Sequence, residues 1–326
     1  MKLTNKSGLD KRWVKMAEKL YNTHPKFGND KFSVTELLKS EKQIALRRIH
    51  DDEIEVDIQR VFPILIGTAC HEALAEVTQE DEELKEEWIA EDRLEMELTP
   101  GITISGGFDA LEKTTWELHD QKFTKLPKIE LSAKGEDDEW FRQLTLYSIL
   151  IENKFGRKPL VGYITAGAKD HSYLRYRSKK KECAKSGKDI DYPEYPIRIL
   201  KFELNDPIKS KMVWEEAKDK ALRVKDILDG NIEPAPCTFG EMWCKEDWAI
   251  MKPNSQRAYR AFFSETDALE FYTKLAKKDE YKIYHRVSEP NNCACFCPCV
   301  QFCEQGKKAL DMEPICEDVT DEILPF

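Results

Sequence analysis

Two neighbouring segments with strand-like patterns, residues 102–112 (ITISGGFDALE) and 114–124 (TTWELHDQKFT), most constrain what this chain can fold into. A further strand is predicted at residues 160–167, and helical segments lie on both sides of these strands along the sequence. Strands interspersed with helices predict an α/β (α+β) fold. The chain has 326 residues, enough for one large domain or two modest ones.

Hydrophobic periodicity predicts helices over residues 10–22, 32–50, 62–77, 136–155 and 210–230. The second of these opens with Ser33 and Glu36 in capping-box spacing, and the third is apolar enough to be buried. The Glu-rich stretch 79–88 is interpreted as a solvated connector or helix face, and the stretch 171–191 as basic and turn-rich.

Pro234 and Pro236 mark a boundary, so we predict one domain over residues 1–230 and a second over 231–326. The second begins with a strand–helix–strand unit and ends in a cysteine-rich tail. No apolar run reaches the ~18 residues of a membrane span, and the start is not a signal peptide. The net charge of −10 argues against a passive coat for polyanions, and we expect a soluble intracellular protein.

Acidic and basic side chains meet in the predicted strand pair. Asp109 ends the first strand, and Asp120 and Lys122 project from one face of the second because strand side chains alternate. Two carboxylates on adjacent strands can share Mg²⁺ or Mn²⁺, and the lysine can orient or deprotonate a water, as phosphodiester hydrolysis requires. The simpler alternative is that Asp109 caps a turn while Asp120 and Lys122 form a surface salt bridge.

Three more side chains carry two interpretations each. His71 lies mid-helix in an apolar stretch, where it is either a satisfied core residue or a third metal ligand that favours Mn²⁺. Gln143 and Tyr147 are spaced i,i+4 on one helix face. They can hydrogen-bond a phosphate and stack on a base, or they are ordinary amphipathic surface.

The tail places five of the ten cysteines within eleven residues, at positions 293, 295, 297, 299 and 303. Thiolates at this density favour zinc or an iron–sulfur cluster, and the sequence does not decide between them. Unliganded reduced thiols are the alternative.

Four motifs in this order resemble a known family: G-T-x-x-H at Gly67–His71, G-F-D at Gly107–Asp109, D-Q-K at Asp120–Lys122 and Q-x-x-x-Y at Gln143–Tyr147. They resemble the PD-(D/E)XK nucleases, and more closely the RecB/Cas4-type exonuclease branch. The matched span covers roughly residues 33–205. The remainder, including the cysteines, is similar to bacteriophage-encoded nuclease-like proteins.

The resemblance implies a restriction-endonuclease-like core within residues 1–230, with a mixed central sheet flanked by helices. It also implies a small Cys-rich metal-binding domain in residues 231–326. It implies four metal-binding groups: the side chains of His71, Asp109 and Asp120 and the backbone carbonyl of Gln121. Lys122 would position the water nucleophile and stabilise transition-state charge, and Gln143 and Tyr147 would organise the DNA strand near its end. Many members have Glu where this chain has Asp120, and the family accepts either.

The resemblance also implies a set of cysteine ligands. Members of this branch often hold a 4Fe–4S cluster with one distant Cys and a C-terminal triplet. The distant Cys usually lies upstream of the metal-binding His, but residues 1–69 of this chain contain no Cys. The likeness to phage-encoded proteins implies another set, with zinc as the alternative to the cluster: Cys237, Cys293, Cys297 and Cys303.

Basic side chains gather in the stretch 171–191, where Tyr173 and Tyr176 lie between them. This patch can follow a phosphate backbone while the aromatic rings stack on bases, or it is a solvated loop. Its members are Arg175, Arg177, Lys179, Lys180, Lys181, Lys185 and Lys188.

The sequence therefore predicts a divalent-metal-dependent deoxyribonuclease, an exonuclease that hydrolyses phosphodiester bonds at DNA ends in phage recombination, replication or DNA processing. A structure- or sequence-specific endonuclease and a non-catalytic DNA- or protein-binding module that keeps the fold are the alternatives. DNA is the expected partner, with an annealing protein, a single-strand-binding protein or a helicase as further candidates and no membrane. The expected location is the cytoplasm, that of the host cell if the chain is phage-encoded.

Overall fold

The computed structural model describes residues 2–21, 27–187, 189–190, 192–253, 255, 257–311 and 313–320. The chain forms two compact units, Met1–Leu38 with Glu55–Ile232 and Lys39–Ile54 with Glu233–Phe326. The sequence predicted one boundary, at residue 230. The structure places it two residues later and also assigns residues 39–54 to the second unit, because their side chains pack against C-terminal segments.

The first unit is a mixed α/β structure. Its helices are α1 (Lys11–Tyr21), α2 (Val34–Leu37), α4 (Ile58–Glu80), α5 (Glu82–Glu87), α6 (Leu126–Ala133), α7 (Glu139–Phe155), α8 (Tyr173–Ser186) and α9 (Pro207–Leu228). Its strands are β1 (Lys2–Thr4), β2 (Lys31–Ser33), β3 (Glu55–Asp57), β4 (Trp88–Thr99), β5 (Ile102–Glu112), β6 (Leu118–Thr124), β7 (Val161–Ala168) and β8 (Ile197–Glu203). The predicted class, a mixed central sheet flanked by helices, is confirmed.

Six strands form the central sheet, with the order β2-β5-β6-β7-β8 and with β4 paired to β5. The pairs β2–β5 and β6–β7 are parallel, whereas β4–β5, β5–β6 and β7–β8 are antiparallel. The long strand β5 pairs with β4 along its length and meets β2 and β6 near its two ends. The sheet is therefore mixed, and β5 and β6 bring the two motif carboxylates onto neighbouring strands.

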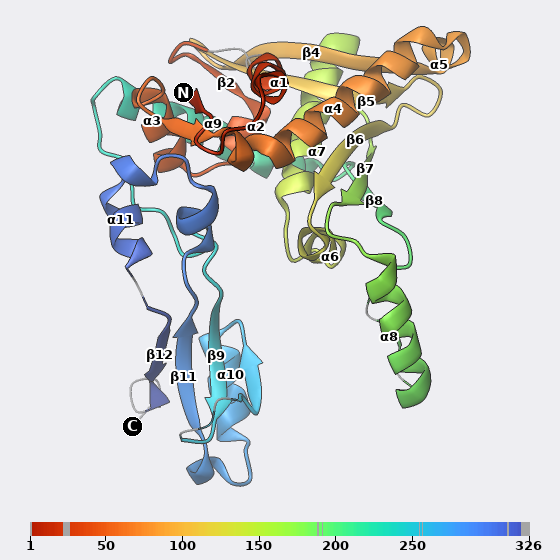
Figure 1. Cartoon of the computed structure of the whole chain (residues 1–326). Helices are drawn as coiled ribbons and strands as arrows, with labels where there is room; N and C mark the ends of the chain where they lie inside the picture. Colours follow the sequence, from red (N-terminus) through yellow and green to blue (C-terminus); the bar gives the residue numbers. More distant parts are fainter. Residues whose placement is uncertain are drawn as a thin grey trace. The chain divides into compact units, whose positions relative to one another are not determined.

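Helix α7 is buried against this sheet within the first unit (Figure 1). Its Tyr147 ring lies over Gly106 of β5, where an added Cβ would come within 2.7 Å of the ring and 2.9 Å of a Val34 methyl carbon. Only glycine leaves room for this approach. The contact fixes how closely α7, with Gln143 on it, approaches the strands.

Two helices differ from expectation. The helix predicted over residues 32–50 is two helices, because the Ser40 side chain accepts a hydrogen bond from Gln43 N and starts a new helix there. The capping box of Ser33 and Glu36 is present at the start of α2. Helix α4 was expected to be buried but exposes much of its apolar surface, with Ile64 and Val77 each more than half exposed.

Helix α4 is the one helix of the described residues that is long and apolar enough to cross a membrane. A single helix of this kind is weak evidence for a span. Its N-terminal half packs Ile58, Val61 and Leu65 against Ala17 of α1. The helix is therefore anchored to the body of the first unit at this end.

Three elements of the first unit differ from the sequence predictions. Strand β4 and helix α6 were not predicted, and the basic stretch 171–191 forms helix α8 instead of a turn-rich loop. Ser172 caps α8 by accepting a hydrogen bond from Arg175 N. In Figure 1, α8 extends away from the sheet, and none of its residues is buried.

The second unit contains a four-stranded antiparallel sheet with the order β10-β9-β11-β12. Its elements are α3 (Glu41–Ile49), β9 (Glu246–Met251), β10 (Arg260–Phe262), α10 (Glu265–Thr273), β11 (Lys282–Val287), α11 (Glu304–Leu310) and β12 (Ile315–Asp318). The predicted strand–helix–strand unit is β10, α10 and β11. Ala268, Tyr272 and Ile283 of this unit form a hydrophobic core with Ile250 of β9.

We expect Gly106→Ala to destabilise the protein by about 1–3 kcal/mol, because its methyl group must displace the Tyr147 ring or the Val34 side chain. Gly107→Ala is the matched control, since the nearest atom to its added Cβ is Asp92 O at 4.0 Å. Its free energy of unfolding should change by less than about 0.5 kcal/mol. Urea unfolding measures both, and equal effects would contradict the close packing of α7.

Candidate functional site

The motif carboxylates meet at the β5–β6 ladder. Ala110 pairs with His119, so Asp109 and Asp120 are neighbours across the two strands. Asp109 Oδ2 accepts a hydrogen bond from Gln121 N at 2.6 Å. Gln121 thus reaches Asp109 through its backbone N–H, and metal binding by its carbonyl stays a prediction.

Asp120 is buried, with 2% of its surface exposed. Its Oδ2 forms an ion pair with Lys122 Nζ, and its Oδ1 accepts a hydrogen bond from Gln143 Nε2 at 3.4 Å. Burial, together with the nearby Asp109 charge, raises the pKa of Asp120 to about 6 against the opposing effect of Lys122. The Asp120–Lys122 pair is therefore not the surface salt bridge of the simpler alternative.

His71 extends from α4 to the same place. Its Nδ1 lies 3.1 Å from Asp109 Oδ2, and its ring meets Phe123 edge-on. Burial lowers the pKa of His71, but the hydrogen bond and charge of Asp109 outweigh burial and raise the pKa overall. With its side chain 30% exposed and facing a carboxylate, His71 is not a core residue satisfied by apolar packing.

Gln143 and Tyr147 are buried side by side on α7, so they are not amphipathic surface. Gln143 Nε2 donates to Tyr147 Oη at 3.0 Å as well as to Asp120. Burial raises the pKa of Tyr147, so the phenol keeps its proton. Both residues support Asp120 in this structure, and their contact with DNA stays a prediction.

Two cations near the site were missed from the sequence. Arg93 of β4 lies opposite Gly107, donates to Ser105 Oγ at 3.2 Å and is close enough for its charge to act on Tyr147. Lys169 follows β7 and donates to the Pro63 carbonyl of α4 at 2.6 Å. Neither belongs to a motif, and Arg93 became visible only once β4 was known to pair with β5.

The donors of this site suit a divalent cation. An imidazole and two carboxylates favour Mn²⁺, and the carboxylates also suit Mg²⁺. The ligand atoms of His71, Asp109 and Asp120 do not form a group lying entirely within 4.8 Å. Lys122 Nζ pairs with Asp120 Oδ2, so a metal ion would have to share that oxygen with the ammonium group or displace it.

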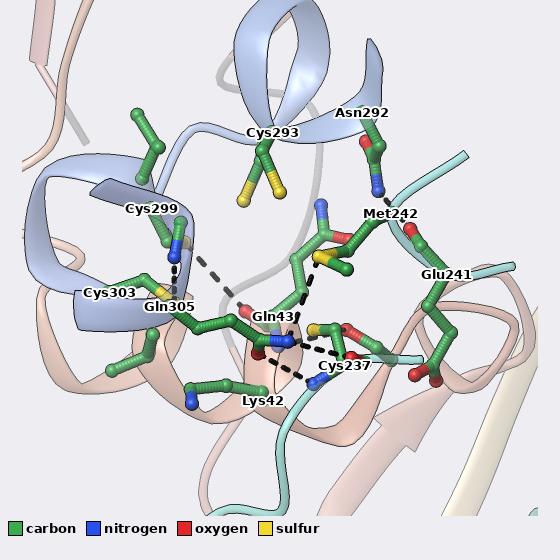
Figure 2. Close-up of a pocket in the computed structure, with 15 residues that line it drawn as sticks. Lys42, Gln43, Cys237, Glu241, Met242, Asn292, Cys293, Cys299, Cys303 and Gln305 are labelled. Carbon is green, nitrogen blue, oxygen red and sulfur yellow. Dashed lines mark hydrogen bonds between the residues drawn. The ribbon is translucent and has the colours of Figure 1, made fainter. Parts of the chain in front are cut away.

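The four predicted cysteine ligands line one pocket of the second unit, together with Cys299 (Figure 2). Cys237 comes before β9, Cys293 lies in a one-turn π-helix (Asn292–Phe296), and Cys303 caps α11 by accepting from Gly306 N at 3.2 Å. Cys244 and Cys295 do not line it. The pocket thus gathers thiols from segments some sixty residues apart.

Hydrogen bonds fasten the Cys237 segment to the tail. Gln305 of α11 accepts from Cys237 N at 2.8 Å and donates to Cys237 O at 2.7 Å (Figure 2). Residues 39–54 supply another wall, where Ser40 Oγ lies 3.4 Å from Cys237 Sγ and Gln43 O lies 3.8 Å from Cys299 Sγ. The thiols therefore lie in a frame built by three separate parts of the chain.

The thiols of the pocket differ in acidity. Hydrogen bonds from the side chain and backbone of Cys299 lower the pKa of Cys297 to about 7, and the same pairing with burial raises the pKa of Cys299. Burial raises the pKa of Cys293 to about 11. Cys297 is therefore the thiol closest to the thiolate form that metals require.

The predicted DNA-binding residues lie on helix α8, except Lys188, which is outside the described residues. Arg175, Arg177, Lys180 and Lys181 are exposed, and Lys179 is half-buried. The Arg175 guanidinium lies over the Tyr192 ring and the Lys180 ammonium over the Tyr176 ring, at 5.1 and 5.5 Å from the ring centres.

No protein-family model matches the chain, and no curated protein matches its sequence. A solved structure described as "Crystal structure of SSO0001" aligns with 71% of this chain and 89% of its own, at 16% identity and a TM-score of 0.43. A similarity this distant carries no argument about the function of this chain. The site has to be judged on its own chemistry.

We expect Mn²⁺ to raise the melting temperature more at pH 7.5 than at pH 5. The pKa of Asp120 is about 6 in the folded protein, above its ordinary value of 3.8. The protonated carboxyl therefore contributes its full stabilisation of the fold below pH 3.8, and this stabilisation is lost as pH rises through 6. The ionised carboxylate then binds the cation, and at about 100 times Kd the metal adds about 2.7 kcal/mol.

Asp120→Asn should lose most of this shift and its pH dependence. The matched control Glu136→Gln, which removes an exposed carboxylate between α6 and α7, should keep both. Differential scanning fluorimetry in Mn²⁺ and in chelator makes the comparison. An undiminished shift in Asp120→Asn would remove Asp120 from the ligand set.

Proposed function

We propose that this chain is a divalent-metal-dependent deoxyribonuclease of the PD-(D/E)XK type. The observation that carries the proposal is the convergence of four motifs on one site. Strands β5 and β6 supply Asp109, Asp120 and Lys122, helix α4 supplies His71, and helix α7 supplies Gln143. A chance salt bridge would not explain why a buried carboxylate, a histidine and a buried amide meet around one lysine.

Each group has a role in phosphodiester hydrolysis. Asp109, Asp120 and His71 would hold Mg²⁺ or Mn²⁺, and the bound ion would supply Lewis-acid polarisation of the scissile phosphate and activation of water. Lys122 orients the attacking water and stabilises negative charge at the phosphate. Gln143 and Tyr147 hold Asp120 in place, because its Oδ1 accepts from Gln143, which also donates to the Tyr147 hydroxyl.

Helix α8 supports nucleic acid as the substrate. Arg175, Lys179, Arg177 and Lys181 form like-charged pairs at i,i+4 spacing, which weaken a helix by about 0.2–0.5 kcal/mol per pair. A phosphate backbone relieves this repulsion, and the exposed Tyr173 ring can stack on a base. Local charge of this density outweighs the net acidity of the chain.

We propose a 4Fe–4S cluster for the second unit, with Cys237, Cys293, Cys297 and Cys303 as ligands. Thiolates gathered at this density suit a 4Fe–4S cluster, and a tetrahedral zinc site is the alternative.

End-dependent cleavage is the form of the activity that we propose, in the cytoplasm of a phage-infected cell. The RecB/Cas4-type motifs, with His71 and the Q-x-x-x-Y motif of Gln143 and Tyr147, favour an exonuclease over a structure- or sequence-specific endonuclease. The non-catalytic alternative is disfavoured because no motif residue of the core is missing. DNA is the proposed partner, with an annealing protein, a single-strand-binding protein or a helicase as further candidates.

We expect the wild-type protein to degrade linear DNA in Mn²⁺ or Mg²⁺ and to leave closed circular DNA intact. Asp120→Asn and Lys122→Met should each lower the rate by at least about 10²-fold, because they remove a metal ligand and the charge beside the phosphate. Lys125→Met, which changes an exposed lysine three residues further on, should keep the wild-type rate.

End-labelled single- and double-stranded substrates in a gel assay measure the rates. Cutting of the closed circle would turn the proposal toward an endonuclease. Equal rates for wild type, Asp120→Asn and Lys122→Met would assign the cleavage to a contaminant and favour a binding module.

The cysteine assignment predicts bound iron and visible absorption in anaerobically purified protein. Cys237→Ser and Cys303→Ser should lose iron and lower the melting temperature, because the cluster holds three chain segments together. The control Cys295→Ser, at an exposed thiol outside the pocket, should keep both. Stoichiometric zinc without iron in the wild-type protein would contradict the cluster and support a zinc site with the same cysteine ligands.

A further inference from the structure

A second group of metal-binding side chains lies at the β5–β6 turn, apart from the proposed catalytic site. Glu112 ends β5, Glu117 immediately precedes β6, and His119 is the second residue of β6. One ligand atom from each lies within 4.8 Å of the other two. Because strand side chains alternate, His119 and Asp120 project from opposite faces of β6.

The two carboxylates of this group share few hydrogen-bond donors, and one of these donors is Tyr163 Oη, which donates to Glu117 Oε1 at 3.4 Å. Thr115 Oγ1 lies 2.9 Å from Glu112 Oε2 and 3.2 Å from Glu117 Oε2, and a hydroxyl has one proton to donate to the pair. Among the described residues neither glutamate has a lysine or arginine within ion-pair distance. The Lys201 ammonium acts on Glu117 electrostatically, but it is paired with Glu203 at 2.7 Å.

Aromatic contacts hold the His119 ring in place, and one of its ring nitrogens has no hydrogen-bond partner among the described residues. Its ring stacks on Tyr163 with ring centres 5.0 Å apart and meets Trp88 edge-on at 4.9 Å. His119 Nε2 is buried and has no hydrogen-bond partner in the described part of the chain. A buried nitrogen without a partner costs free energy that a ligand would recover. It is an observation separate from the acidic pair.

We propose that Glu112, Glu117 and His119 bind a zinc ion. Mixed imidazole and carboxylate donors suit zinc, three protein ligands with one open position are a common zinc arrangement, and zinc binds such donors more tightly than manganese does. Trp88 and Tyr163 shield the site on two sides. The ion joins the end of β5 to the start of β6 and thereby clamps the turn whose strands carry Asp109 and Asp120. This inference does not depend on nuclease activity.

Cobalt(II) as a probe for zinc separates this site from the cysteine pocket, because thiolate ligands give cobalt a charge-transfer absorption that oxygen and nitrogen ligands do not. The full-length protein carries Asp120→Asn throughout, so that the catalytic carboxylates do not compete. We expect one equivalent of cobalt with d–d bands and no sulfur charge transfer, and zinc should displace it.

On that background Glu117→Gln and the double variant Glu112→Gln/Glu117→Gln should bind cobalt at least about tenfold more weakly. Loss of a residue that only hydrogen-bonds a metal ligand already lowers metal affinity by about this factor, and loss of a ligand should lower it at least as much. Glu86→Gln, an exposed glutamate beside the same turn, should bind as the parent does. Circular dichroism without metal checks that each variant folds. If the double variant does not fold, cobalt binding by Glu117→Gln alone tests the site. Unchanged binding in Glu117→Gln, or cobalt spectra with sulfur charge transfer alone, would overturn the site.

Discussion

The burial of the Asp120 carboxylate is the constraint on which the first unit depends. A carboxylate with 2% of its surface exposed is unfavourable unless positive charge and hydrogen-bond donors surround it. Lys122 and Gln143 supply them, and Tyr147 in turn positions Gln143. The bare backbone at Gly106 allows α7 to approach closely enough for these contacts. Sheet, helix and glycine therefore serve a single oxygen-rich site.

The second unit solves a different problem, because its small sheet has a limited apolar core. Order around the thiol pocket comes instead from backbone hydrogen bonds and from helix caps. Gln305 holds the Cys237 backbone by two hydrogen bonds, and Cys303 caps α11. A metal centre at this point would replace the core that the sequence does not provide.

Much of the proposed catalytic site could be predicted from the sequence, because strand alternation and motif order are local. What surrounds it could not. Strand β4 mixes Leu94 and Met96 with charged residues that also suit helices, so its pairing with β5 and the place of Arg93 depend on tertiary contacts. The apolar surface of α4 suggested burial, yet Ile64 is exposed, since periodicity records hydrophobicity and not the presence of a neighbour. Side-chain capping at Ser40 overrode a continuous helical pattern.

The assignment of residues 39–54 to the second unit limits where this chain can be truncated or recombined. The polypeptide passes between the two units three times, after residues 38, 54 and 232. A truncation at residue 232 would leave α3 without the cysteine segments on which it packs. The second unit alone would lack the wall that carries Ser40 and Gln43. Neither unit is a contiguous cassette, so gene fusion or recombination at a single junction cannot exchange one without damaging the other.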